Sequence, residues 1–155
     1  MKKVLIALDY DPTAQKVAET GFKLAGTLGA EVVLLHVMSD PTYYSSAGYS
    51  PIMGFTGYMD MGPMMVDSAE KLRNASQQFL DKTKEHLGSK SIKTLLKEGD
   101  FAESIIETAK ELDTNIIVIG SHGRKWLEKI LMGSVTEKVI SLSDIPLFIV
   151  PTKGK

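Results

Sequence analysis

The chain has 155 residues, and its 18 lysines and arginines nearly balance its 19 aspartates and glutamates. This length is typical of one domain, and the balance gives no basic field that would attract nucleic acid or an acidic membrane surface. Because the chain has no cysteine, disulfides, thiolate nucleophiles and cysteine-based metal sites are excluded. The N-terminal apolar run stops at Asp9, too early for a signal peptide or a membrane span. We therefore expect a soluble cytoplasmic protein with a single domain over 1–155.

The first half of the chain alternates short apolar runs with helical patterns. Strands are predicted at 4–8 and 32–37, because both runs are apolar throughout. Between them, residues 12–28 place apolar side chains at helical spacing, and Gly29 follows as a residue that ends helices. A second helix is predicted at 66–87.

The second half continues the same alternation. An alternating strand is predicted at 92–96, and further strands at 116–119 and 147–150, with helices at 100–112 and 134–142. Asp100 and Glu103 have the spacing of a capping box at the start of the third helix. Strands alternating with helices predict a doubly wound α/β fold with a five-stranded parallel sheet and helices on both faces. Ligands bind such sheets outside the carboxyl ends of the strands.

Glycines mark the exit of the predicted fourth strand. Gly120 follows the strand, Gly123 and Gly133 come after two and nine further residues, and Ser134 follows at once. A glycine at a strand exit lets a ligand approach the backbone where a Cβ would block it. Backbone N–H groups at the start of the next helix suit a phosphate chain. The alternative is that these glycines serve only the turns.

This spacing, G-x2-G-x9-G followed by serine, resembles the nucleotide-binding signature of the universal stress protein family. The order of the predicted elements agrees with that family over nearly the whole chain, apart from an insertion at about 39–65. The resemblance implies a sheet with strand order 3-2-1-4-5, of the adenine nucleotide alpha hydrolase-like type. It also implies an adenine nucleotide ligand, which is ATP, ADP or AMP, with Mg²⁺ or Mn²⁺ as the accompanying cation.

The resemblance also implies roles for individual residues. Asp9 would lie near the ribose and is a candidate for holding the cation, whereas an ordinary turn aspartate is the alternative. Ala7 and Val37 would form the apolar walls around adenine, or they are simply strand core. The phosphates would lie against the glycine signature and the helix after it, at Gly120, His122, Gly123, Gly133, Ser134, Val135 and Thr136.

Catalytic signals are weak. Ser121 and His122 are adjacent, which rarely gives a base the geometry to reach a nucleophile, and no G-x-S-x-G elbow surrounds them. His36 and His86 lack metal-ligand spacing, and the chain has no Walker A motif. We therefore expect binding without efficient turnover, with slow ATP hydrolysis at most, rather than an enzyme.

Two interaction surfaces are expected. The segment 39–65 is rich in Tyr, Met and Gly, and we expect it to cover the crevice or to pack on a protein partner. The family resemblance implies a homodimer in which the final strand, 147–150, pairs with its symmetry mate. The favoured function is that of an ATP-binding stress-response protein acting as a nucleotide-dependent sensor or regulator. The alternatives are an interaction module with a vacant or vestigial pocket, and an enzyme that is a slow ATPase or a transferase.

Overall fold

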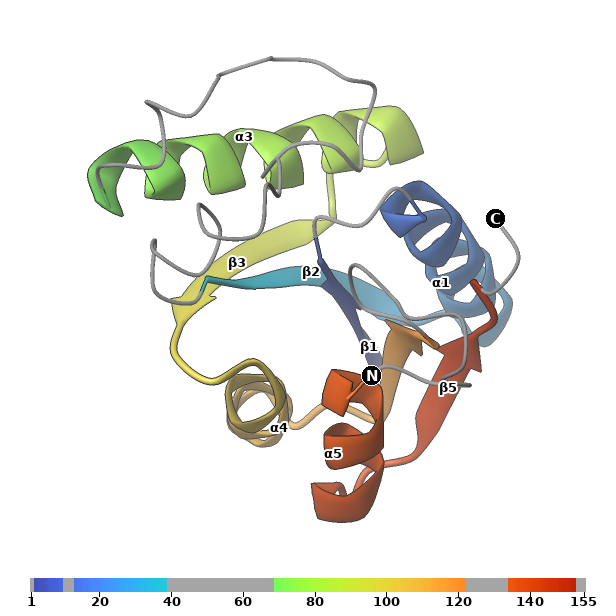
Figure 1. The fold of residues 1–155 in the computed structure, drawn as a ribbon. Coiled ribbons are helices and arrows are strands. Elements are labelled where there is room, and N and C mark those ends of the chain that lie inside the picture. Colours follow the sequence, from blue (N-terminus) through green and yellow to red (C-terminus); the bar gives the residue numbers. More distant parts are fainter. Residues whose placement is uncertain (1, 10–12, 39–68, 122–133, 153–155) are drawn as a thin grey trace.

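The computed structural model describes residues 2–9, 13–38, 69–121 and 134–152 (Figure 1). Strands and helices alternate along this part of the chain, as predicted. The elements are β1 (Lys3–Leu8), α1 (Ala14–Leu28), β2 (Glu31–Met38), α3 (Ala69–Leu87), β3 (Lys93–Glu98), α4 (Phe101–Glu111), β4 (Ile116–Gly120), α5 (Ser134–Leu142) and β5 (Leu147–Val150). None of the described helices is both long and apolar enough to cross a bilayer.

The five strands form one parallel sheet in the order β3-β2-β1-β4-β5, which confirms the predicted fold class. β1 is central, and Leu8 is in register with His36 of β2 while Ile6 is in register with Val118 of β4. After β3 the chain crosses to the other side of β1 to form β4. The strand order therefore reverses between β1 and β4, which is where doubly wound sheets bind ligands.

Helices cover both faces of the sheet, α1 and α3 on one side and α4 and α5 on the other (Figure 1). Successive strand side chains point to opposite faces, so Leu5 belongs to the core under α4 and Ile6 to the core under α1 and α3. Both side chains are fully buried. This two-sided burial is why the strands have continuous apolar runs.

α1 lies unusually close to the sheet at Gly21. A Cβ on this residue would lie 2.8 Å from Cδ1 of Ile6 and 3.1 Å from Cγ1 of Val118. The glycine therefore sets how near the helix can pack. At the end of the same helix, Gly29 has a φ of 66°, as the predicted helix end requires.

One predicted strand is displaced. β3 runs over Lys93–Glu98 rather than 92–96, because its hydrogen-bonding register with β2 pairs Val33 with Lys93 and Met38 with Glu98. Ile92 is 2 % exposed but lies before the strand. The predicted alternation is absent, since the four inner residues of this edge strand are all half-buried. In α3 the described helix begins at Ala69, and residues 66–68 lie outside the described part.

Candidate functional site

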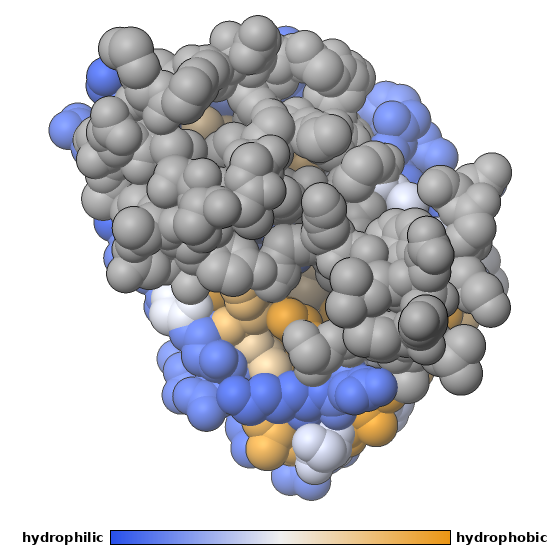
Figure 2. All heavy atoms as spheres, viewed as in Figure 1, coloured by the Kyte–Doolittle hydropathy of each residue, from blue (hydrophilic) through white to orange (hydrophobic). Residues whose placement is uncertain are grey.

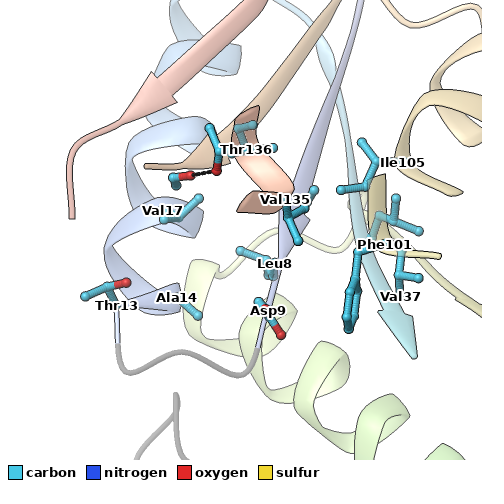
Figure 3. A pocket seen from close by; sticks show the side chains of 14 residues that line it. Leu8, Asp9, Thr13, Ala14, Val17, Val37, Phe101, Ile105, Val135 and Thr136 are labelled. Atoms are coloured by element: carbon cyan, nitrogen blue, oxygen red, sulfur yellow. Dashed lines mark hydrogen bonds between the residues drawn. The ribbon is translucent and has the colours of Figure 1, made fainter. Parts of the chain in front are cut away.

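A pocket lies at the carboxyl ends of β1, β2 and β4 (Figure 3). Its cavity volume is about 50 Å³. Most of its described lining is apolar. The lining residues are Ala7, Leu8, Asp9, Thr13, Ala14, Val17, Leu35, Val37, Phe101, Ile105, Ile119, Gly120, Val135 and Thr136.

The strand exits form one wall of this pocket. Asp9 follows β1 and Gly120 ends β4, so the pocket brings them together at the point where the strand order reverses. Ala7 and Val37 contribute apolar side chains from β1 and β2. The strand order thus explains why residues more than a hundred positions apart line one hollow.

The N-terminal ends of three helices form the rest of the lining. α1 contributes Ala14, α4 contributes Phe101, and α5 contributes Val135 and Thr136. The first N–H groups of a helix have no partner within the helix, and the helix dipole makes this end partly positive. The convergence of three such ends on one apolar pocket suits a ligand with an apolar part and an anionic part.

Thr136 connects α5 to the end of β4. Its hydroxyl donates a 2.8 Å hydrogen bond to the carbonyl oxygen of Gly120, and the residue is 2 % exposed. A hydroxyl has a single proton to donate, so Thr136 can offer a ligand only its lone pairs. The contact fixes the first turn of α5 against the exit of β4.

The start of α4 is also fixed by side chains. Asp100 caps the helix, with its Oδ2 accepting a 2.9 Å hydrogen bond from the backbone N–H of Glu103, as the capping-box spacing predicts. Lys138 of α5 places its Nζ 3.3 Å from the same oxygen. The backbone N–H of Glu103 and then the Lys138 ammonium hold the pKa of Asp100 below its ordinary value. α4 and α5 are thereby linked beside the pocket.

His36 of β2 supports the end of β1 on the face of the sheet that α1 and α3 cover. It is fully buried, its Nδ1 lies 2.8 Å from the carbonyl oxygen of Leu8, and its ring meets that of Phe79 edge-on at 5.7 Å. Burial lowers the pKa of His36 from 6.5 to about 4, although the Leu8 carbonyl favours the charged form. The histidine is therefore neutral near pH 7, with its proton on Nδ1, and it has a structural role.

His86 and Ser121 also have local structural contacts. Nε2 of His86 lies 2.6 Å from a carboxylate oxygen of Glu19, which joins α3 to α1. The Ser121 hydroxyl accepts a 3.0 Å hydrogen bond from the backbone N–H of Thr152 and lies 3.2 Å from the Thr152 hydroxyl. Ser121 thus connects the end of β4 to the chain after β5.

The structure brings six of the predicted site residues together in the pocket: Ala7, Asp9, Val37, Gly120, Val135 and Thr136. Ser134 begins α5, but its side chain lies outside the described part, as do the residues His122, Gly123 and Gly133 and the segment 39–65. Within the described ranges, no group of three or more His, Asp or Glu side chains is placed to hold a metal ion. A cation held by Asp9 would therefore need ligand oxygens as well.

Sequence reasoning missed the residues that the helix starts contribute. Thr13 and Ala14 at the start of α1 and Phe101 at the start of α4 line the pocket. Their positions in the sequence could have indicated this, because Thr13 and Ala14 follow β1 and Phe101 follows β3, and both strands end at the same edge of the sheet.

Comparison with known proteins identifies relatives along the whole chain. The model of the universal stress protein family matches residues 1–151. The universal stress protein MJ0577 of Methanocaldococcus jannaschii is 32% identical over 161 residues, which cover 99% of this chain and 96% of the relative.

Solved structures show the same fold. The structure of MJ0577 superposes with a TM-score of 0.73 and 29% identity, over 99% of this chain and 98% of that one. A universal stress protein in complex with cAMP gives a TM-score of 0.61 at 16% identity, over 97% and 96% of the two chains. A universal stress protein of Archaeoglobus fulgidus in complex with dAMP gives 0.57 at 18% identity, over 97% and 98%.

Proposed function

The chain belongs to the universal stress protein family, and we propose that its pocket binds an adenine nucleotide, with ATP as the principal ligand. In this proposal the protein is a cytoplasmic stress-response regulator, and nucleotide occupancy is the signal. The cAMP and dAMP complexes of two relatives with this fold support an adenine ligand.

One observation carries the proposal: a single pocket joins the apolar side chains of β1 and β2 to the start of α5. Adenine would lie between Ala7 and Val37. The phosphates would extend past Gly120 toward the N–H groups at the start of α5, whose partial positive charge favours anions. Asp9 would accept hydrogen bonds from the ribose hydroxyls and help to hold Mg²⁺ or Mn²⁺ through the phosphates.

The described lining favours binding over turnover. Asp9 is the one titratable side chain among the described residues that line the pocket. Rapid hydrolysis needs a group that activates or positions water together with groups that stabilise the developing charge on the phosphates. We therefore propose slow ATP hydrolysis at most.

We also propose that the protein forms a homodimer through β5. This strand is at the edge of the sheet, and a bare edge strand invites pairing with another chain. Phe148 on β5 is 37 % exposed, and Ile140 and Leu142 of α5 are 40 % and 44 % exposed. Figure 2 shows apolar surface among the described atoms on the side of α4 and α5. A second copy would cover this surface.

The nucleotide proposal can be tested directly. Freshly purified protein is denatured, released nucleotide is identified by mass spectrometry, and ATP with Mg²⁺ is then titrated calorimetrically. We expect stoichiometric adenine nucleotide or saturable binding. Asp9→Asn should weaken binding, whereas Asp81→Asn on the exposed part of α3 is the matched control and should leave it unchanged.

Absence of both released nucleotide and binding heat would contradict the proposal. That result would favour the interaction module, in which the pocket is vestigial and the segment 39–65 contacts a protein partner. Steady ATP turnover that is lost in Asp9→Asn while affinity persists would instead favour an enzyme.

A further inference from the structure

The pocket is small for the ligand proposed. Its cavity volume is about 50 Å³, whereas small-molecule pockets usually measure about 300–1,000 Å³. A planar base could enter the apolar part of the pocket only if a side chain there changes position. The lining side chains differ in how readily they can do so.

Most apolar lining residues are fixed in the core. Val37, Leu35 and Ile105 are at most 5 % exposed and belong to the packed cluster under α4 and α5. Moving any of them would disturb the close packing of this cluster. Phe101 differs, because it is half-buried and stands at the first position of α4.

Phe101 is also the largest described side chain in the pocket and its one aromatic ring. In Figure 3 the Phe101 ring extends between Val37 and Asp9. It also packs against both hydrophobic clusters, so it lies where the cores on the two faces of the sheet meet.

The backbone beneath this ring is held firmly. Asp100 caps α4 through the N–H of Glu103, and the Lys138 ammonium of α5 lies 3.3 Å from the capping oxygen. Fraying of the helix start is therefore opposed, so widening the pocket at this point requires rotation of the Phe101 side chain rather than movement of its backbone.

We infer that Phe101 is the base-recognition residue of this pocket: its ring turns aside to widen the apolar part and then stacks on the planar base of the nucleotide. This inference rests on the proposed function. Stacking on an aromatic ring selects for a flat ligand and adds affinity of the size seen when aromatic residues that contact bases are replaced by alanine. The class of ligand that the pocket accepts is thereby narrowed to molecules with a planar base.

The test compares ring variants by calorimetry with ATP and Mg²⁺. Phe101→Leu keeps an apolar side chain but removes the aromatic face, and we expect ATP affinity to fall by about 5- to 100-fold. Phe101→Tyr keeps the ring and should bind as the wild type does. Phe22→Leu is the matched control, because Phe22 is also partly buried but lies on α1 outside the described lining of the pocket.

A spectroscopic measurement separates stacking from a purely structural role. The H2 and H8 protons of ATP should move upfield on binding to the wild type, because they lie over the Phe101 ring, and this displacement should vanish in Phe101→Leu. Equal affinity in Phe101→Leu, or bound ATP without the upfield displacement in the wild type, would overturn the inference while the proposed function stands. The wild-type spectrum decides even if Phe101→Leu does not fold. Failure of the wild type to bind ATP would overturn the proposed function itself.

Discussion

His36 on β2 donates a 2.8 Å hydrogen bond from Nδ1 to the carbonyl oxygen of Leu8, its register partner on β1. The imidazole can make this contact while neutral, but burial lowers its pKa to about 4 from 6.5. Below about pH 6.5 the histidine of the unfolded chain therefore binds a proton, whereas His36 of the folded protein binds it only below about pH 4. The contribution of the neutral histidine to the free energy of unfolding is fully present above about pH 6.5, and it is lost as the pH falls from about 6.5 to about 4.

We predict that acidification from about pH 7.5 to about pH 5 lowers the free energy of unfolding by about 2 kcal/mol through this histidine. Urea denaturation across this range measures the loss. In His36→Leu the part of the slope due to histidine should disappear, even if the variant is less stable at every pH. Identical slopes in the variant and the wild type would show that His36 titrates normally.

The second prediction concerns the two glycines within α1. Gly21→Val places atoms where Ile6 and Val118 already pack, and should lower the free energy of unfolding by about 1–3 kcal/mol. Gly26→Ala is the control in the same helix, because a Cβ there meets nothing within 4 Å. That change should stabilise the protein by about 0.5–1 kcal/mol, since alanine favours helix. Thermal unfolding of both variants should give shifts of opposite sign.

The third prediction separates the cap of α4 from its ion pair. Asp100→Ala removes the acceptor for the Glu103 N–H and should reduce stability by about 0.5–2 kcal/mol. Lys138→Met removes only exposed ion pairs, to Asp100 and Glu103, and should change stability by about 1 kcal/mol or less. The first loss should persist in high salt, whereas the second should shrink. Equal salt dependence in chemical denaturation would argue against this division.

The fourth prediction addresses the proposed dimer. Phe148→Asp puts a charge at a half-exposed apolar position on edge strand β5, and we expect analytical ultracentrifugation to show monomers at concentrations where the wild type is dimeric. Lys93→Asp, on the opposite edge strand β3, should leave the sedimentation unchanged. Dissociation by both changes, or by neither, would place the interface elsewhere.

The sequence predicted the element order well because a sheet covered on both faces has continuous apolar strands, as in β1. The limits of β3 were less clear, because register with β2 extends this edge strand to Glu98 beyond its apolar residues. Gly120 was identified through the spacing of the glycines. Phe101 was missed because the glycine spacing says nothing of the helix after β3, and its place in the pocket follows from the strand order and from which helix starts meet there.

The central place of β1 has a consequence for hydrogen exchange. Its amides are paired with β2 on one side or lie against β4 on the other, and Leu5 and Ile6 are completely buried. These amides should exchange with deuterium only when the whole molecule unfolds, whereas the start of α1, which also lines the pocket, opens in local fluctuations. The part of the pocket lining that β1 contributes thus belongs to the most protected part of the chain, and the lining at the start of α1 belongs to a less protected part. A ligand should slow amide exchange at the start of α1 far more than in β1.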